Sequence, residues 1–337
     1  MKVLIVKTSS MGDIIHTLPA LTDATKAHPG IRFDWVVEEG FSEIPKWHAS
    51  VDKVIPVAIR RWRKNIFKTF KNGEWSAYKK ELQQQNYDAI IDAQGLLKSA
   101  VLVSKVAKGP RYGLDKHSAK EPLAARFYDH TISVSKELHA VERVRQLFAS
   151  ALNYSISEEI GDFAIKQHFS INLDKSEPYL VFQHSTTRFD KHWPEAYWIT
   201  LIRKAGEAGW KIKLPWGSAK EKERAERFAK NAPHVEVLPK LPLSEIAHVL
   251  ASATACVSVD TGLSHLAAAL DTPNVILFGS TDPGLVGGYG KNQQCLEAKD
   301  YPNTGAQIEP AIFASLTPEI VWDHLDKFIC TKSHPET

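Results

Sequence analysis

The sequence has few cysteines and no long hydrophobic run. Its three cysteines, Cys256, Cys295 and Cys330, stand far apart without metal-site spacing, which argues against a disulfide framework and favours a reducing compartment. The longest mostly apolar run, residues 249–259, falls well short of the roughly 20 residues that span a bilayer. The first ten residues, MKVLIVKTSS, hold only four apolar residues between two lysines. We therefore expect no signal peptide and a cytosolic protein.

Several common site motifs are also missing. The chain contains neither G-x-G-x-x-G nor G-x-x-x-x-G-K-[ST], which weakens a dinucleotide or P-loop interpretation. It has no D-x-D, the acidic motif that binds the cation in metal-dependent sugar transferases, and no G-x-S-x-G or H-E-x-x-H. These absences count against several hydrolase and metalloenzyme classes.

The charge is nearly balanced overall but not locally. Lys and Arg number 42 and Asp and Glu 39, a net charge of +3, which does not indicate a nucleic-acid-binding protein. Between residues 53 and 71, however, there are only basic charges. This segment holds Lys53, Arg60, Arg61, Arg63, Lys64, Lys68 and Lys71, interleaved with Trp62, Phe67 and Phe70. A solvated face, a nucleic-acid site and an anionic membrane surface all fit this spacing.

The chain is long enough for two domains, and its pattern repeats accordingly. Short apolar runs alternate with amphipathic helical stretches in both halves, which predicts parallel sheets covered by helices. A polar segment at 155–178 separates the halves and is interpreted as a linker. The expected strands are residues 2–7, 33–37, 53–59, 87–92, 179–183, 210–214, 235–238, 255–259 and 275–278. Dehydrogenases, periplasmic-type binding proteins and nucleotide-sugar transferases all fit this architecture.

Polar segments follow two of the expected strands. Thr8-Ser9-Ser10-Met11-Gly12-Asp13 comes after the first, and position alone explains Asp13 as an ordinary residue in the first turn of a helix. The later segment Asp260-Thr261-Gly262-Leu263-Ser264-His265 opens a helix whose first amides would suit a phosphate. There, a ligand site and an Asp N-cap beside a core histidine remain equally open.

A third segment follows the strand expected at 179–183. Its hydroxyls at Thr186 and Thr187 and its cations at Arg188 and Lys191 resemble a grip for a diphosphate. A solvated loop would look much the same. The equivalent position of the Asp260 segment in the same predicted sheet favours a ligand site, because ligands bind at the carboxyl ends of parallel strands.

Taken together, these segments resemble the lipopolysaccharide heptosyltransferases of glycosyltransferase family 9. The resemblance spans residues 1 to about 295 in order, and the run Arg60–Lys64 favours the type I enzymes of the inner core. The matching segments are VLIVKTSSMGDIIHTLPAL, FDWVVEEGF, VIPVAIRRWRK, DAQGLLKSA, HAVER, KHWPE, KLPWG, SVDTGLSHLAAALDTPN and TDPGLVGGYGKNQ.

The resemblance implies a GT-B fold, with two Rossmann-like domains facing across a central cleft. Residues 1–160 would bind the acceptor and residues 175–316 the nucleotide sugar, and a final helix at 317–332 would cross back to the first domain. The implied reaction transfers L-glycero-D-manno-heptose from ADP-heptose to the first Kdo of Kdo2-lipid A, with inversion and without a metal or other cofactor. The enzyme would work at the cytoplasmic face of the inner membrane and bind no nucleic acid.

The resemblance also assigns roles. Asp13 would be the general base and Lys191 would stabilise the departing ADP. The donor would contact Thr186, Thr187, Lys191, Glu221, Leu241, Asp260, Thr261, Gly262 and His265. The acceptor would contact Ser10, Arg60, Arg61, Arg63, Lys64 and Lys120, although the family leads us to expect arginine in place of Lys120. Two alternatives stay open: a related transferase with another nucleotide sugar, and a non-catalytic module that binds anionic ligands.

Overall fold

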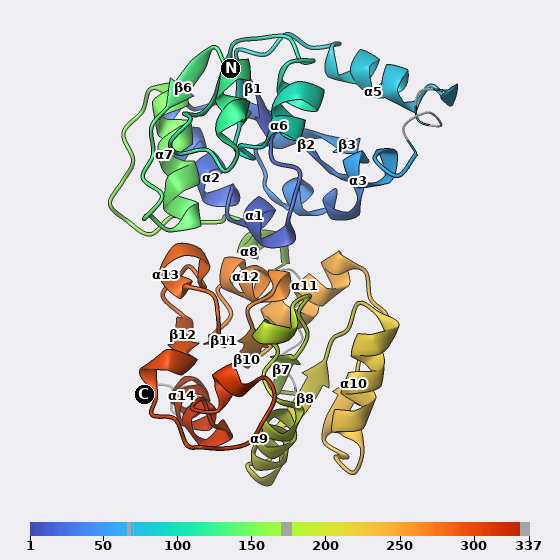
Figure 1. Cartoon of the computed structure of the whole chain (residues 1–337), viewed down its shortest axis with the longest axis vertical. Coiled ribbons are helices and arrows are strands. Elements are labelled where there is room, and N and C mark those ends of the chain that lie inside the picture. Colours follow the sequence, from blue (N-terminus) through green and yellow to red (C-terminus); the bar gives the residue numbers. More distant parts are fainter. Residues whose placement is uncertain (66–68, 70, 170–176, 331–337) are drawn as a thin grey trace. The chain divides into compact units, whose positions relative to one another are not determined.

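The computed structural model describes residues 1–65, 69, 71–169 and 177–330 (Figure 1). The chain divides into two compact units, Met1–Ile165 and the residues from Lys166 onward. The division falls inside the polar segment 155–178 that the sequence predicts as a linker. Each unit is described by itself below.

Unit 1 is built on one parallel sheet. In its described residues the strands lie in the order β3-β2-β1-β4-β5-β6. They are β1 (Lys2–Val6), β2 (Arg32–Glu38), β3 (Val51–Val57), β4 (Ala89–Asp92), β5 (Arg111–Leu114) and β6 (His130–Ile132). The central strand β1 reads KVLIV and is buried from Val3 to Val6, as expected for a strand with helices on both faces.

Helices cover both faces of this sheet. On one face α5 packs Tyr78 and Leu82 against residues of β1, β3 and β4, and on the other α2 and α7 lie together, with Phe148 of α7 near Phe33 of β2. The helices are α1 (Met11–Ile15), α2 (Leu18–Ala27), α3 (Ile59–Trp62), α5 (Glu74–Leu82), α6 (Leu97–Ser99) and α7 (Ala140–Leu152). Shorter helical turns are η1 (Glu39–Phe41), η2 (Ile44–Trp47), η3 (Ala100–Ser104) and η4 (Pro122–Phe127).

Unit 2 repeats the same plan. Its described strands lie in the order β12-β11-β10-β7-β8-β9, again all parallel. They are β7 (Tyr179–Gln183), β8 (Lys211–Leu214), β9 (Val235–Val237), β10 (Ala255–Val259), β11 (Asn274–Phe278) and β12 (Gln293–Glu297). This strand order is that of the doubly wound nucleotide-binding sheets. The two sheets confirm the prediction of two Rossmann-like α/β domains.

The helices of unit 2 also lie on both faces. Those around β10 and β11 include α12 on one face and α14 on the other. The helices are α8 (Lys166–Phe169), α9 (Glu195–Glu207), α10 (Ala219–Ala229), α11 (Leu243–Ser252), α12 (Gly262–Ala269), α13 (Pro283–Val286) and α14 (Pro318–Cys330). Short turns are η5 (Phe189–Lys191), η6 (Ala298–Asp300) and η7 (Ala311–Phe313).

The last described helix packs within unit 2. That residues 317–332 cross back to the first domain stays a prediction. In the structure α14 belongs to unit 2, where it packs against α9 and buries Val321, Leu325 and Ile329 in that unit's core. The spacing of these apolar residues, four apart along one helix face, accounts for the packing. Residues 331 and 332 lie outside the described residues.

No helix among the described residues is both long enough and apolar enough to pass through a lipid bilayer.

Candidate active site

Both sheets place polar loops where parallel sheets bind ligands. In unit 1 the strand order reverses between β1 and β4, and in unit 2 it reverses between β7 and β10. The loops that leave two such neighbouring strands diverge, which opens a crevice at the carboxyl ends. The segments that the sequence singled out leave β1, β7 and β10, so the topology puts them at these switch points.

Asp13 lies in α1, directly after the loop that leaves β1. Its carboxylate accepts hydrogen bonds from the backbone amide and the hydroxyl of Ser10, both at 2.8 Å. The side chain stays 46% exposed, so it is held by its own loop yet reachable from solvent. The structure therefore brings together Ser10 and Asp13 and leaves one face of the carboxylate open.

Two residues that the sequence analysis missed hold this loop. Lys7, at the end of β1, donates to the carbonyl of Ala93 and lies 3.6 Å from Asp13. Gln94, in the loop after β4, accepts from the amide and hydroxyl of Thr8 and from the amide of Ser9. The sequence does not reveal these contacts. Those with Ala93 and Gln94 join residues more than 80 positions apart, and the contact between Lys7 and Asp13 depends on how the loop turns.

The electrostatic setting of Asp13 favours the ionised carboxylate. Burial acts to raise its pKa, but the charge of Lys7, the hydrogen bonds from Ser10 and the charge of Lys120 outweigh burial, and the pKa lies below its ordinary value. Asp13 is thus unprotonated at neutral pH, as a general base must be. Lys120, which the sequence analysis assigned to the acceptor, lies within electrostatic reach of this carboxylate.

The basic residues predicted to face the acceptor lie after β3. Arg60, Arg61, Arg63 and Lys64 are all exposed, and the first, second and fourth line a pocket of about 380 Å³ with residues 38–41. Phe67, Lys68 and Phe70 lie outside the described residues.

Carboxylates from elsewhere in the chain reach into this basic segment. Arg61 pairs with Glu39 at 3.3 Å and with Glu74 at 2.8 Å, and Lys53 pairs with Glu81 at 3.1 Å. The sequence count, which found only basic charges at 53–71, therefore overstates the positive charge of this surface.

In unit 2 the predicted donor residues meet around Asp260. Its carboxylate lies 2.5 Å from the ammonium of Lys191 and 4.0 Å from His265, and its backbone carbonyl accepts from the hydroxyl of Thr186 at 3.0 Å. The side chains of Asp260 and Lys191 are only 9% and 18% exposed. A lysine ammonium has three donors, so Lys191 can hold Asp260 and still offer hydrogen bonds to a diphosphate. Thr187, the residue after Thr186, is exposed.

The helix after Asp260 is capped by its neighbour. Thr261 is the N-cap of α12; its backbone amide donates to the hydroxyl of Ser264 at 3.4 Å, and that hydroxyl donates to the carbonyl of Thr261 at 2.6 Å. The alternative in which Asp260 is a helix N-cap is therefore wrong. The carboxylate of Asp260 pairs with Lys191 instead of capping the helix. Gly262, which is half-buried, begins α12 and has no side chain that would crowd a ligand at this helix end.

Glu221 and Leu241 follow the strands β8 and β9. Glu221 sits in the first turn of α10, where it accepts from the amides of Gly217 and Ser218. Its carboxylate thus caps the loop, which is a structural role beside the predicted contact with the nucleoside. Leu241 is half-buried in the loop before α11. Both lie at the carboxyl end of the sheet, as the predicted donor site requires.

A further connection in unit 2 was not anticipated. Asp190 pairs with Arg188 and accepts from the hydroxyl of Ser280, which follows β11, at 2.5 Å. This ties the loop after β7 to the loop after β11. The carboxylate of Asp190 therefore offsets part of the positive charge that Arg188 could offer to a diphosphate.

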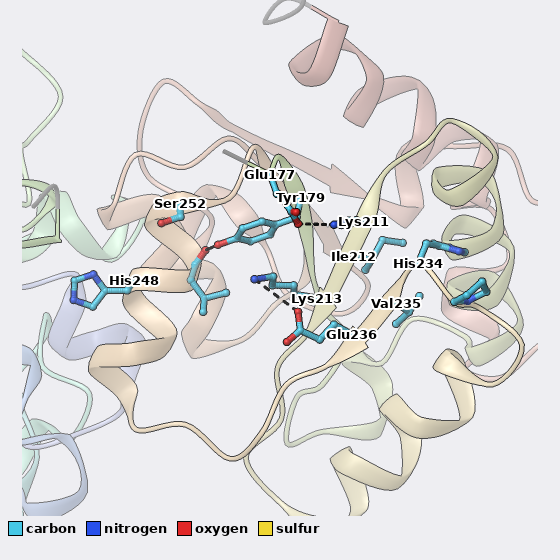
Figure 2. Close-up of a pocket in the computed structure, with 12 residues that line it drawn as sticks. Glu177, Tyr179, Lys211, Ile212, Lys213, His234, Val235, Glu236, His248 and Ser252 are labelled. Carbon is cyan, nitrogen blue, oxygen red and sulfur yellow. Dashed lines mark hydrogen bonds and ion pairs between the residues drawn. The ribbon is translucent and has the colours of Figure 1, made fainter. Parts of the chain in front are cut away.

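A pocket of about 790 Å³ lies elsewhere in unit 2 (Figure 2). It is lined by residues at or near the starts of β7, β8 and β9 and by residues of α11, whereas Asp260 follows the carboxyl end of β10. Figure 2 shows that its charges are paired: Lys211 contacts Glu177 at 2.5 Å, and Lys213 contacts Glu236 at 3.7 Å. Because Lys211 and Lys213 are paired with carboxylates, this pocket is less suited to an anionic ligand than the group around Asp260 and Lys191.

Among the described residues, no group of three or more His, Cys, Asp or Glu side chains is arranged to hold a metal ion.

Comparison with known proteins gives one consistent result. The model of glycosyltransferase family 9 (heptosyltransferase) matches residues 75–312, more than half of the chain. Lipopolysaccharide heptosyltransferase 1 of Escherichia coli strain K12 is 59% identical over 300 residues, which cover 88% of this chain and 94% of that protein.

Two solved structures of E. coli heptosyltransferase WaaC are also similar. The structure with ADP has a TM-score of 0.91 and 54% identity, covering 97% of this chain and 100% of that chain. The structure with ADP-2-deoxy-2-fluoro heptose has a TM-score of 0.88 and 53% identity, covering 97% and 99%. These matches show that the chain belongs to glycosyltransferase family 9, the heptosyltransferases, and that it is a glycosyltransferase.

Proposed function

We propose that the protein transfers L-glycero-D-manno-heptose from ADP-L-glycero-D-manno-heptose to the first Kdo of Kdo2-lipid A, with inversion at the anomeric carbon. The observation that carries this proposal is the 54% identity and TM-score of 0.91 to an enzyme solved with ADP. A structure of that enzyme with an ADP-heptose analogue supports the same donor. The reaction would build the inner core of the lipopolysaccharide of the Gram-negative outer membrane.

The donor belongs to unit 2. Lys191 and the amides at Thr261 and Gly262 offer hydrogen bonds for the diphosphate, while Asp260 and His265 are placed to contact the heptose or the adjoining phosphate. Thr186, Glu221 and the backbone near Leu241 would hold the nucleoside. The hydrogen bonds from Lys191 and the two amides would stabilise the negative charge that grows on ADP as it leaves. A metal ion has this role in other transferases. We therefore expect no metal requirement.

The base belongs to unit 1. In a single displacement, the acceptor hydroxyl oxygen forms a bond to the anomeric carbon of heptose while the bond from that carbon to the β-phosphate oxygen breaks. ADP departs with the electron pair, and the hydroxyl proton passes to Asp13. One attack from the face opposite the leaving group inverts the anomeric centre. The low pKa of Asp13 keeps this carboxylate ready to accept the proton.

The acceptor explains the basic surface of unit 1. Kdo carboxylates and lipid A phosphates are anions, and Arg60, Arg63 and Lys64 are exposed cations after β3. Lys120 and Ser10 lie closer to the base and would contact the Kdo that reacts. Arginine suits such ligands because its planar guanidinium pairs with both oxygens of a carboxylate or phosphate. The acyl chains of the acceptor would keep the enzyme at the cytoplasmic face of the inner membrane.

Two alternatives remain to be separated from this function. A related transferase would accept another ADP- or UDP-sugar, and a non-catalytic module would bind anions without turnover. The Asp13 carboxylate favours an enzyme, since a binding protein for anions gains nothing from an exposed carboxylate among its cations.

The test is a transfer assay with purified protein, ADP-heptose and Kdo2-lipid A in the presence of EDTA. We expect glycolipid product and stoichiometric ADP release, no product with ADP-glucose or UDP-glucose, and about a 10²–10⁴-fold slower rate for Asp13→Ala. Asp323→Asn, which removes an exposed carboxylate from α14, is the matched control and should keep the wild-type rate. No ADP release by the wild-type protein, or an Asp13→Ala variant as fast as wild type, would refute the proposal.

A further inference from the structure

A buried lysine lies directly beneath the proposed base. Lys7 is the residue after β1, and its side chain is only 8% exposed. Lysine is among the residues least often buried, and a buried ammonium needs partners that replace the water it loses. The transfer mechanism described above gives this buried ammonium no role.

The partners of Lys7 connect the two loops of the unit 1 switch point. Its ammonium donates to the carbonyl of Ala93, after β4, at 2.8 Å, and lies 3.6 Å from a carboxylate oxygen of Asp13, after β1. Ser10 binds the other carboxylate oxygen at 2.8 Å. Asp13 is thus held on one oxygen by its own loop and faces Lys7 with the other.

We propose that Lys7 is a positioning residue for the transfer reaction, which fixes the Asp13 carboxylate in place and in its charged form. This inference rests on the proposed role of Asp13 as general base. Lys7 acts through Asp13, because its side chain is only 8% exposed while that of Asp13 is 46% exposed.

Lys7 differs from the other charges around Asp13. Lys120 also lowers the pKa of Asp13, but it is exposed and would be paired with the anions of a bound acceptor. His16 ends the same helix, and its ring packs 5.5 Å from that of His139 at the start of α7. Lys7 is buried and its ammonium lies 3.6 Å from Asp13, so acceptor anions would not take it away from this carboxylate.

The placement has a cost and a benefit for catalysis. A nearby cation makes Asp13 a weaker base, yet it keeps Asp13 unprotonated and oriented, and orientation is worth more than small changes in basicity. Removing the charge should therefore slow the reaction at neutral pH while raising the pKa that governs activity in acid. A merely structural lysine would change neither the acid limb nor the protonation of Asp13.

The test compares Lys7→Met, Lys7→Gln and Lys7→Arg with wild type. Met and Gln remove the charge, Gln keeps a donor for the Ala93 carbonyl, and Arg keeps the charge. Lys2→Met is the matched control, because Lys2 lies at the other end of β1 and pairs with Asp34 and Asp52. Circular dichroism and ADP affinity establish that each variant is folded and that unit 2 is intact.

We expect kcat at pH 7 to fall about 10–100-fold in the two neutral variants. In these two variants, the apparent pKa at which kcat/KM falls in acid should rise by about 1 unit. This is the low end of the range for one nearby charge, because Asp13 is half exposed. Lys7→Arg and Lys2→Met should keep the wild-type limb. Titration of ¹³C-labelled Asp13 by NMR, assigned with Asp13→Asn, should show the same shift without any need for turnover.

The outcomes separate the two proposals. If wild type makes no glycolipid, the proposed function fails, while the NMR titration still tests whether Lys7 controls Asp13. If wild type is active and Asp13→Ala is slow, but folded Lys7→Met and Lys7→Gln keep both the acid limb and the Asp13 titration of wild type, the inference about Lys7 is wrong.

Discussion

The contact between Lys191 and Asp260 can be measured as a coupling free energy. At 2.5 Å, two unit charges attract by about 2 kcal/mol in water and about 7 kcal/mol at an effective dielectric constant of 20. Desolvation of the two ions offsets much of this attraction, because the side chains are only 18% and 9% exposed. We therefore expect a net coupling of about 1–3 kcal/mol.

The perturbation is a double-mutant cycle with Lys191→Met, Asp260→Asn and the combined variant. Each single change should lower the free energy of unfolding, Lys191→Met by about 3–5 kcal/mol, because it leaves a buried carboxylate without its cation. The combined variant should be more stable than the sum of the two losses predicts, by the coupling free energy. Urea denaturation followed by fluorescence gives these values.

An exposed pair of the same length is the control. Lys211 and Glu177 also lie 2.5 Å apart, but their side chains are 62% and 72% exposed. Their cycle, with Lys211→Met and Glu177→Gln, should give no more than about 1 kcal/mol. Equal coupling in the two pairs, or additive losses at Lys191 and Asp260, would refute the argument that burial strengthens the contact at the donor site.

Other predictions follow from single contacts. Gln94→Ala removes three hydrogen bonds from the loop before Asp13 and should lower the free energy of unfolding by about 1–2 kcal/mol, with a larger fall in kcat than in ADP affinity. Arg63→Ala should raise the KM for acceptor about tenfold and leave the KM for donor unchanged. Arg61→Ala should raise the acceptor KM less, because Glu39 and Glu74 already offset the charge of Arg61. Steady-state kinetics with each substrate varied in turn would measure both effects. Burial lowers the pKa of His48 to about 4, so between pH 6.5 and 4 the unfolded chain binds a proton that the folded chain does not. Stability should therefore fall as pH drops through this window, by up to about 1.4 kcal/mol per pH unit, and urea denaturation of His48→Gln should show a weaker dependence.

The sequence predicted most strands of both sheets, including the edge strands β3 and β9, and missed three. The expected strands 2–7 and 255–259 correspond to β1 and β10, whose side chains are almost all buried and therefore apolar. By contrast, β5, β6 and β12, which read RYGL, HTI and QQCLE, were missed. These strands lie at or next to the edges of their sheets, and unlike the edge strand β3 (VDKVIPV) they are short or hold few apolar residues, so hydropathy alone does not distinguish them from loops.

The candidate site was predicted in part for a similar reason. Asp13, Lys191 and Asp260 stand out because each lies in a polar segment directly after an apolar strand, a signal that is local in sequence. Lys7 and Gln94 give no such signal, since their roles depend on the pairing of β1 with β4, which joins residues more than 80 positions apart. The carboxylates that meet the basic segment were missed for the same reason.

The two halves of the chain use one device for opposite charges. In each, the switch point places a carboxylate beside a lysine: Asp13 with Lys7 in unit 1, and Asp260 with Lys191 in unit 2. In unit 1 the lysine is buried and the carboxylate is half exposed, so the carboxylate is the group that would meet a ligand. In unit 2 both partners are mostly buried, and the lysine, the slightly more exposed of the two, is the group that would meet a ligand. The proposed transfer, which would take a proton from one substrate and stabilise the anion that leaves the other, calls for both arrangements, and each unit supplies one of them.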